Sequence, residues 1–480
     1  MKLKEITSTY SPRFPSVVAY MLQSTEYQSK PYLNWLWRTT DFSKVQNRRV
    51  LERTSKAKLL EAFLRLGMAL EIIAGIVLLI LGIITSTVWE WELGIPLIIS
   101  YPFVWSHLVV IPLELGRILV VEPNERKLVA QSTQLFAKHE AVKIAVAGSY
   151  GKTTMKELLN TTIGEGRSVA ATVANKNVAI EHAKFAKSLN GKEEVLIIEF
   201  GEGAPGDVER FSQTTKPTHA VITGLAPAHL DKYKTIEAAG KDIFYLASFL
   251  KGNNVFVNGE SEAVRQFIKP NYLTYDSSGV GDWKVSGVKV GIEGLSFNLS
   301  SDKLMLNLKS SLIGRHQIGP LSAVAAIAFD LGLSKNQIEK GIAKTCPFEH
   351  RMQPYNIGGA WIIDDTYNGN IEGIKAGTQI LKELKAKRKI YITPGLVDQG
   401  QETERIHLEM GKLIALSSPD LVILMNNSVS SVIKKGLEQN TFKGEVQIVD
   451  DPLFFYSNIE HMVAKGDIVL MQNDWTDNYS

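Results

Sequence analysis

Two long apolar stretches near the start of the chain stand apart from the rest of its hydropathy pattern. Residues 72–89 carry no charge, and a second uncharged run covers 93–113 after Glu90 and Glu92. Each is about as long as a helix that crosses roughly 30 Å of hydrocarbon. A pair of buried core helices is the alternative, but a core helix rarely stays apolar on every face for so long. The pattern predicts a two-helix transmembrane hairpin, with spans at about 70–89 and 93–113.

The charges that flank the hairpin predict its orientation. Lys and Arg are frequent before the first span and follow the second, while the short link between them is acidic. Because positive loops stay inside, both ends are expected in the cytoplasm. Pro96, Pro102 and Pro112 interrupt the second span, so a re-entrant or interfacial segment stays open for it. We expect a basic cytoplasmic arm at 1–66, the hairpin within 67–116, and a linker at 117–140. Residues 1–60 could be a small amphipathic platform or a partly disordered arm.

A glycine-rich loop follows the first strand-like run of the remaining chain. Val142–Ala147 leads into the heptapeptide Gly148-Ser149-Tyr150-Gly151-Lys152-Thr153-Thr154, and a helical stretch follows. Strand, glycine loop and helix form the context of a phosphate-binding loop, although Val146 stands where a first glycine is usual. Backbone N–H groups would face the phosphates, Lys152 would neutralise them, and the Thr153 hydroxyl could bind Mg²⁺. The motif predicts an ATP site.

Polar residues follow two later strand-like runs. Glu199 ends the run that starts at Val195, and His229 comes soon after the run 220–223. Carboxyl ends of strands face the ligand crevice in doubly wound sheets, so both side chains are candidate metal ligands. A lone Glu or His is more often structural, and Lys241 by itself is typical of a solvated surface lysine.

Composition narrows the classes of function. The net charge of +3 is small, so a nucleic-acid partner is not expected. Cys346 is the only cysteine, which excludes an internal disulfide and a cysteine-cluster metal site.

With these motifs in view, the chain resembles the Mur ligase family over about residues 141–480. The phosphate loop comes first, and the other matching segments follow in family order: Thr172–Asn177, Ile198–Gly201, Ala228–Asp231, Lys241, Gly314–His316, His350–Met352 and Ile363–Asn370. The resemblance implies an α/β fold with a P-loop doubly wound central domain at 141–350. A smaller Rossmann-like C-terminal domain would follow at 351–480, and a hairpin-like insert is expected at 285–310.

The resemblance also implies roles for particular residues. Lys152, Lys241 and His229 would be catalytic, and Thr153, Glu199, His229 and a carbamylated Lys241 would hold Mg²⁺. The nucleotide-binding set would be the phosphate loop from Gly148 to Thr154 together with Asn175, His316, Arg351 and Asp365. His407 matches a family histidine to which we assign no role.

The reaction that the family implies is ATP-dependent amide formation. A carboxylate receives the γ-phosphoryl group, and an amine attacks the resulting acyl phosphate. The acceptor is expected to be a UDP- or lipid-linked muramoyl peptide of peptidoglycan synthesis, and the amine an amino acid or a dipeptide such as D-alanyl-D-alanine. The enzyme would be a multi-pass membrane protein with cytoplasmic catalytic domains.

Several departures keep alternatives open. Nothing before Ala141 looks like a uridine-nucleotide site. The identity of the acceptor is therefore left open, whereas the type of reaction is not. Gln317, Gly369 and the segment 472–474 also differ from the family pattern. A γ-glutamyl polymer ligase of the capsule or folate type is the alternative enzyme, and a non-catalytic ATP-binding membrane scaffold is the alternative of another class.

Overall fold

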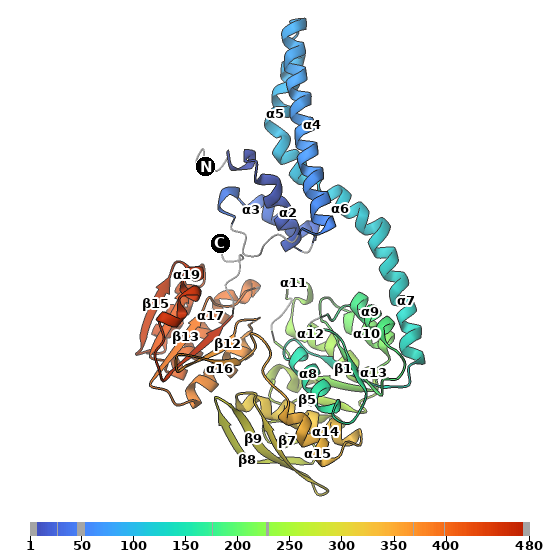
Figure 1. Ribbon diagram of the computed structural model, residues 1–480, viewed down its shortest axis with the longest axis vertical. Coiled ribbons are helices and arrows are strands. Elements are labelled where there is room, and N and C mark those ends of the chain that lie inside the picture. The colour runs from blue at the N-terminus through green and yellow to red at the C-terminus, as the bar shows by residue number, and fades with distance from the viewer. Residues whose placement is uncertain are drawn as a thin grey trace. The chain divides into compact units, whose positions relative to one another are not determined.

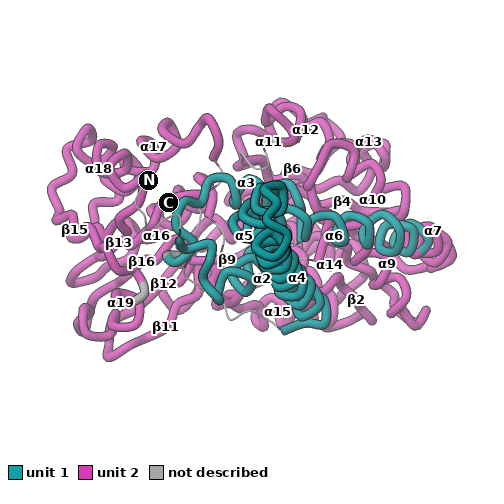
Figure 2. Tube along the Cα trace, turned by 90° about the horizontal axis from the view of Figure 1, so that it is seen from above, with its two compact units in different colours: residues 1–127 teal, residues 128–480 magenta. Residues whose placement is uncertain are grey.

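The structure, a computed structural model, divides into two compact units, residues 1–127 and 128–480 (Figure 2). The described residues are 7–25, 27–45, 53–174, 176–226, 230–367, 369–397 and 399–473.

The first unit is helical, and its longest elements form an antiparallel hairpin (Figure 1). Helix α4, Ser55–Thr85, and helix α5, Trp89–Leu108, are joined at Ser86, whose φ of 56° ends α4. Further helices continue the chain: α6 Val110–Gly116, the π-helix η3 Arg117–Val121 and α7 Glu122–Lys138.

The helices of this region extend beyond the expected membrane spans. Helix α4 begins at Ser55, ahead of the span expected at about 70–89, because the Thr54 hydroxyl caps it by accepting from the Ala57 N–H at 3.2 Å. Glu90 and Glu92 lie in the first turn of α5 and not in the link, a position where carboxylates are favourable. Pro96 and Pro102 lie inside α5 without ending it. The linker expected at 117–140 is helical through Lys138.

Glycines form the contact between the two helices of the hairpin. A Cβ atom on Gly75 would lie 2.9 Å from the Gly94 carbonyl oxygen, and one on Gly67 would lie 2.2 Å from the Trp105 ring. Close backbone approach of this kind is typical of helix pairs in lipid. Large apolar side chains point outward instead, and at least half of their surface is exposed: Ile73, Ile80, Ile84, Leu93 and Ile99.

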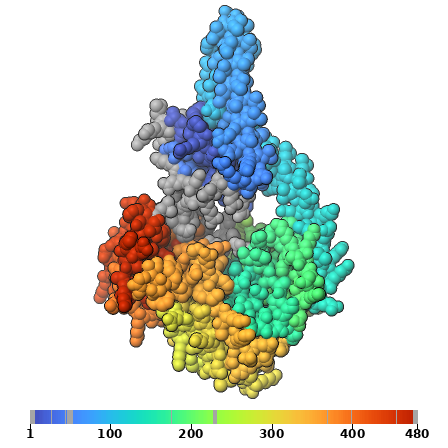
Figure 3. Space-filling view, viewed as in Figure 1, coloured from blue at the N-terminus to red at the C-terminus, as the bar shows by residue number. Residues whose placement is uncertain are grey.

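The hairpin meets the length and composition needed to cross a membrane. The apolar windows of its two helices, Ser55–Thr85 and the continuous helix Trp89–Lys138, have mean hydropathies of 2.6 and 1.7. Only 22% of each window is buried, unlike the core helix of a soluble protein. Figure 3 shows the tip of the hairpin as a bare rod of these two helices.

The described part of the N-terminal segment is a group of short helices, which we call the platform. Its elements are η1 Ser8–Tyr10, α2 Phe14–Ser24, α3 Ser29–Arg38 and η2 Phe42–Lys44. Phe14, Val18 and Leu22 of α2 share a buried cluster with Leu60 and Leu64 of α4. The Tyr32 hydroxyl also donates to the Ser106 carbonyl oxygen of α5 at 2.8 Å, so the platform packs on both helices of the hairpin.

The second unit begins with a mixed sheet that, among the described residues, has the strand order β10-β9-β8-β7-β6-β5-β4-β1-β3-β2. Its first six strands are parallel: β1 Val142–Ala147, β2 Val169–Ala171, β3 Val195–Glu199, β4 His219–Ile222, β5 Val255–Asn258 and β6 Leu273–Asp276. Ile144 and Val146 pack into one buried cluster, while Ala145 and Ala147 pack into another. Alternate residues thus face helices on both sides, as expected of a doubly wound sheet.

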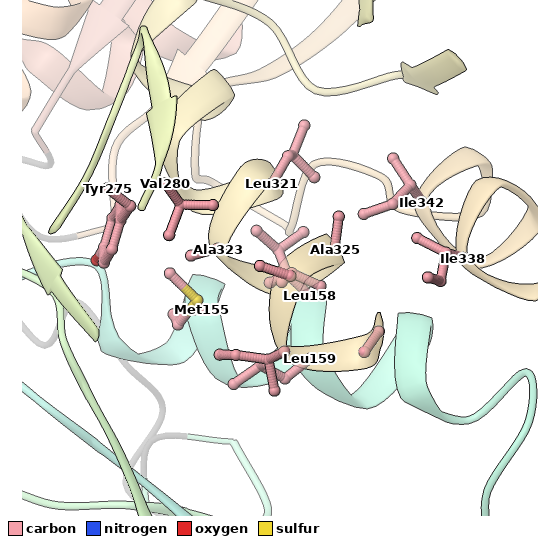
Figure 4. Packing of buried hydrophobic residues seen from close by; sticks show 14 of the residues in the cluster. Met155, Leu158, Leu159, Tyr275, Val280, Leu321, Ala323, Ala325, Ile338 and Ile342 are labelled. Atoms are coloured by element: carbon pink, nitrogen blue, oxygen red, sulfur yellow. The ribbon is translucent and has the colours of Figure 1, made fainter. Parts of the chain in front are cut away.

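Helices cover both faces of this sheet. They are α8 Lys152–Ile163, α9 Ala179–Ser188, α10 Asp207–Thr215, α11 Leu230–Tyr233, α12 Ile236–Ile243, α13 Tyr245–Phe249, η4 Glu262–Phe267, η5 Arg315–Gln317, α14 Ile318–Asp330 and α15 Lys335–Ala343. Met155, Leu158 and Leu159 of α8 belong to the same buried cluster as Leu321 and Ala325 of α14 (Figure 4). This packing fixes α8, whose first turn carries Lys152 and Thr153.

The segment expected as a hairpin-like insert is an antiparallel extension of the same sheet. Its strands are β7 Gly279–Val280, β8 Trp283–Gly291, β9 Gly294–Ser300 and β10 Met305–Ser310. Leu295, Phe297 and Leu299 are buried on one face of β9, so the alternation seen in the sequence is real. The extension joins the sheet because that apolar face continues the central core.

A second sheet of order β11-β12-β16-β13-β14-β15 follows. Its strands are β11 Gln353–Ile357, β12 Ala360–Asp365, β13 Arg388–Thr393, β14 Leu421–Met425, β15 Glu445–Val449 and β16 Asp467–Gln472, with only β11 antiparallel. The helical elements are α16 Ile371–Glu383, η6 Gly400–Glu402, α17 Thr403–Ser417, α18 Ser430–Gln439, α19 Pro452–Ser457 and η7 Ile459–His461. The open parallel sheet agrees with the small Rossmann-like domain expected here.

Candidate active site

The glycine loop after β1 has the backbone that a phosphate-binding loop requires. Gly148 has a φ of 144° and Gly151 a φ of 75°, both unfavourable for other residues. A Cβ atom on Gly148 would also lie 2.3 Å from the Thr223 hydroxyl oxygen. The Ser149 N–H donates to the Gly224 carbonyl oxygen at 2.8 Å, which ties the loop to the end of β4. The loop therefore leads directly into α8, and the first N–H groups of this helix can face an anion.

Tyr150 packs against the segment after β4. A Cβ atom on Gly224 would lie 2.3 Å from the Tyr150 ring, so only glycine leaves room for it. Burial raises the pKa of Tyr150 to about 12, so its hydroxyl is protonated at neutral pH. Its contribution here is to the shape of the loop.

Lys152, the loop lysine, is buried and paired. Its Nζ lies 2.6 Å from Oε2 of Glu202 and donates to the Gly148 carbonyl oxygen at 2.5 Å. Sequence reasoning missed Glu202. The signal that could have found it is its position three residues after Glu199, at the same strand end as the phosphate loop.

Glu199 lies beside the second functional residue of the loop. The pairing of β1 with β3 sets Glu199 opposite Val146, so its carboxylate reaches α8. Its Oε1 accepts from the Thr153 hydroxyl and from the Asn177 amide, both at 3.2 Å. Its buried Oε2 makes no hydrogen bond and lies 3.4 Å from the Lys156 Nζ. The Thr153 hydroxyl and the Glu199 carboxylate are oxygen ligands of the kind that a hard divalent cation prefers.

Lys156 and His182 are two buried residues of this site that sequence reasoning missed. Lys156, one turn after Lys152, is fully buried and donates to the Ala174 carbonyl oxygen in the segment before Asn175. The His182 Nε2 lies 2.8 Å from the Glu199 carbonyl oxygen, and burial lowers the pKa of this imidazole to about 4. Lys156 therefore positions the Glu199 side chain, and neutral His182 positions its backbone. In the sequence, the only signal for Lys156 is its i, i+4 spacing from Lys152, which places both lysines on one face of α8.

Three other sequence-predicted residues are not placed at the site by the structure. His229 and Asn175 lie outside the described residues. Lys241 is exposed on α12, next to Asp242, whose carboxylate accepts from the Tyr233 hydroxyl at 2.7 Å. Metal binding by His229 and carbamylation of Lys241 stay predictions.

A second group of predicted residues gathers at the end of β12. Oδ2 of Asp365 accepts from the Gln472 amide at 2.9 Å, and Oδ1 accepts from the Met352 N–H at 3.2 Å. Burial raises the pKa of Asp365 to about 6, against the lowering effect of these hydrogen bonds and of Arg351. The Arg351 guanidinium lies 4.1 Å from the centre of the Tyr367 ring, a cation–π contact that leaves its N–H edge available.

His316 and His407 are both neutral, for different structural reasons. Burial lowers the pKa of His316 to about 4, and its Nε2 lies 2.9 Å from the Gln317 amide nitrogen. A half-buried neutral ring suits stacking on a base. The His407 Nε2 accepts from the Leu396 N–H at 3.0 Å, beside Gly395 with its φ of 95°. The role of His407 is to hold the turn after β13.

These features define the class of the protein. A buried lysine in a glycine loop between β1 and α8, with a carboxylate at the neighbouring strand end, is the site of a P-loop nucleotide-binding α/β protein. Two family models match the chain, the Mur ligase middle domain over residues 146–328 and the Mur ligase glutamate ligase domain over 350–472. The chain belongs to the Mur ligase family and is an ATP-dependent ligase.

Individual relatives agree with this assignment. The chain is 25% identical over 362 residues to the UDP-N-acetylmuramoyl-tripeptide--D-alanyl-D-alanine ligase of Haemophilus influenzae, covering 74% of this chain and 78% of the relative. It is 22% identical over 374 residues to the Bacillus subtilis ligase of the same name, covering 77% and 80%.

Solved structures show the same fold. The MurF ligase of Thermotoga maritima in complex with ADP superposes with a TM-score of 0.65 at 21% identity, covering 74% of this chain and 81% of that one. A pseudomurein peptide ligase type C from Methanothermus fervidus gives 0.54 at 19% identity, covering 71% and 78%.

Proposed function

We propose that this ligase joins D-alanyl-D-alanine to the terminal carboxylate of a muramoyl tripeptide, with ATP converted to ADP and phosphate. The observation that carries the ATP-dependent chemistry is the pairing of Lys152 and Thr153 with acidic residues at the strand end of Glu199. The names of the Haemophilus and Bacillus relatives support this choice of substrates.

The proposed chemistry assigns distinct work to each residue group. Lys152 and the loop N–H groups bind the β- and γ-phosphates. Thr153 and Glu199 would hold Mg²⁺, which neutralises charge on the transferring phosphoryl group. The γ-phosphoryl group passes from ATP to the acceptor carboxylate, and ADP is the leaving group. The amine then attacks the resulting acyl phosphate, and phosphate leaves as the amide forms. Arg351 and Asp365 contact the nucleotide from the C-terminal sheet, and neutral His316 lies against the adenine.

We also propose that α4 and α5 cross a membrane, with the catalytic unit on the cytoplasmic side. The support is the packing of the hairpin, which is the reverse of that in a soluble protein. Glycines lie at the contact between the two helices, and large apolar side chains lie on the outside. Both family matches begin after this region, at residues 146 and 350. A lipid-linked muramoyl peptide is therefore an acceptor to test beside the UDP-linked one.

The chain's single cysteine makes the membrane topology testable. A Thr87→Cys variant places a thiol at the turn of the hairpin, while Cys346 is exposed on the catalytic unit. In intact cells freed of outer layers, a membrane-impermeant thiol reagent should label Cys at position 87 but reach Cys346 only after lysis. Labelling of Cys346 before lysis would overturn the orientation.

Phosphate release tests the reaction. The purified full chain, with ATP and Mg²⁺, should release phosphate only when a muramoyl tripeptide and D-alanyl-D-alanine are both present. UDP-linked and lipid-linked acceptors form two arms, and alanine, glutamate and ammonia replace the dipeptide in controls. Turnover with a γ-glutamyl acceptor alone would contradict the proposal.

A further inference from the structure

Lys152, the lysine of the phosphate loop, forms a buried ion pair with Glu202. Exposure of the two side chains is only 10% and 6%, and their charged atoms are 2.6 Å apart. Lys152 is the residue expected to meet the phosphates, yet a carboxylate of the chain already neutralises it. A nucleotide must therefore compete with Glu202 for the lysine.

The neighbouring charges do not favour the nucleotide either. Lys156 lies 3.4 Å from Glu199 and 3.3 Å from Glu157, so two buried lysines face three carboxylates. Polyphosphate brought into this site adds several more negative charges. In a site shielded from water, such repulsion is weakly screened and costs more than in solution.

We propose that Glu202 makes the phosphate loop selective for the cation-bound form of the nucleotide. Without a divalent cation, the polyphosphate does not displace Glu202, and Lys152 stays paired. When a cation accompanies the phosphates, its charge compensates both the polyphosphate and the displaced carboxylate. Glu202 is thus a specificity-determining residue of the nucleotide site, and this role rests on the proposed function of that site.

A purely structural role for Glu202 makes the opposite prediction. If the carboxylate only held Lys152 in place, its removal would misplace the lysine and weaken every form of the nucleotide. If it competes with the phosphates, its removal strengthens binding of the metal-free form. The two roles therefore differ in the sign of one measurable change.

The experiment compares the full chain with Glu202→Gln, which keeps a hydrogen-bond acceptor but removes the charge. Binding of ADP and of a non-hydrolysable ATP analogue is measured by calorimetry in EDTA and in Mg²⁺. We expect metal-free nucleotide to bind Glu202→Gln about tenfold more tightly than the unaltered chain, about 1.4 kcal/mol. The affinity for the Mg²⁺ complex should change far less. Glu202→Asp, whose carboxylate retreats by one methylene, should lie between the two.

Unchanged or weaker metal-free binding by both variants would overturn the proposal. A Glu202→Gln chain without a cooperative unfolding transition would do the same, since the pair would then be structural. Neither result depends on turnover. Failure of the proposed ligase reaction would appear instead as absent phosphate release from a chain that still binds nucleotide.

Discussion

The Nδ1 atom of His350 lies 2.7 Å from Oδ2 of Asp364. This contact ties the segment between the two sheets to the end of β12. His350 and Met352 both have left-handed backbone, with φ of 59° and 48°, and Arg351 lies between them. Left-handed non-glycine residues are costly and need such fixed partners. The pair therefore positions Arg351.

Loss of the His350 side chain should loosen Arg351. In His350→Ala we expect kcat/KM for ATP to fall by about tenfold or more, equal to about 1.4 kcal/mol or more. His350→Asn is the matched control, because Asn tolerates left-handed backbone and its amide can replace Nδ1. Steady-state kinetics with varied ATP tests this, and equal losses in the two variants would contradict it.

The Tyr367 ring should hold Arg351 through its face and not through its hydroxyl. Cation–π contacts at exposed sites are worth about 0.5–1 kcal/mol, so Tyr367→Leu should raise the KM for ATP by about two- to fivefold. Tyr367→Phe keeps the ring and should resemble the unaltered chain. A large effect of Tyr367→Phe would instead assign the role to the hydroxyl.

Asp365 should make stability depend on pH. Its folded pKa of about 6 lies above the ordinary 3.8, so folding favours the protonated form. Stability should therefore fall as pH rises from about 4 to about 6, and the loss should persist above that range. Asp365→Asn removes the buried charge and should be more stable by about 3 kcal/mol near neutral pH, with little difference near pH 4. Thermal unfolding at the two pH values tests this; a variant less stable than the unaltered chain at both would refute the assignment.

The glycine contact in the hairpin should be intolerant of side chains. Gly75→Leu places atoms where only 2.9 Å separates a Cβ position from the Gly94 carbonyl oxygen, so α4 and α5 must move apart. We expect a lower unfolding temperature in detergent and faster proteolysis between the helices. Ile84→Leu keeps the side-chain volume at an exposed outer position and should have no effect. Similar behaviour of both variants would argue against the close contact.

Short motifs in the sequence mark candidate residues of the nucleotide site, but they do not indicate which charges pair there. Lys152, Thr153 and Glu199 could be found because short patterns and strand ends mark them. Glu202 and Lys156 could not, since their roles depend on which carboxylate reaches which lysine after β1 and β3 pair. Arg351 and Asp365 were predicted by resemblance, but the raised pKa of Asp365 follows only from burial.

The sequence marks the strands of the C-terminal sheet more directly than the ends of the helices in the first unit. Strands such as Leu421–Met425 are short apolar runs with polar ends, so their limits are visible. Helix α4 extends 17 residues ahead of the uncharged run that begins at Ile72, because a Thr cap and not hydrophobicity sets its start. Beyond the hairpin, helical backbone continues through polar residues to Lys138, which a hydropathy pattern cannot reveal.

The chain order of the hairpin has a consequence for biosynthesis. Helices α4 and α5 precede every strand of both sheets, and β1 needs the later strands β3 and β4 as partners. Since chains emerge from the ribosome N-terminus first, the apolar hairpin is exposed before any part of the catalytic core can close. If α4 and α5 cross a membrane as proposed, their large outward side chains need a hydrophobic environment during translation. Targeting of the ribosome, rather than release of a finished enzyme, would then precede folding of the ligase.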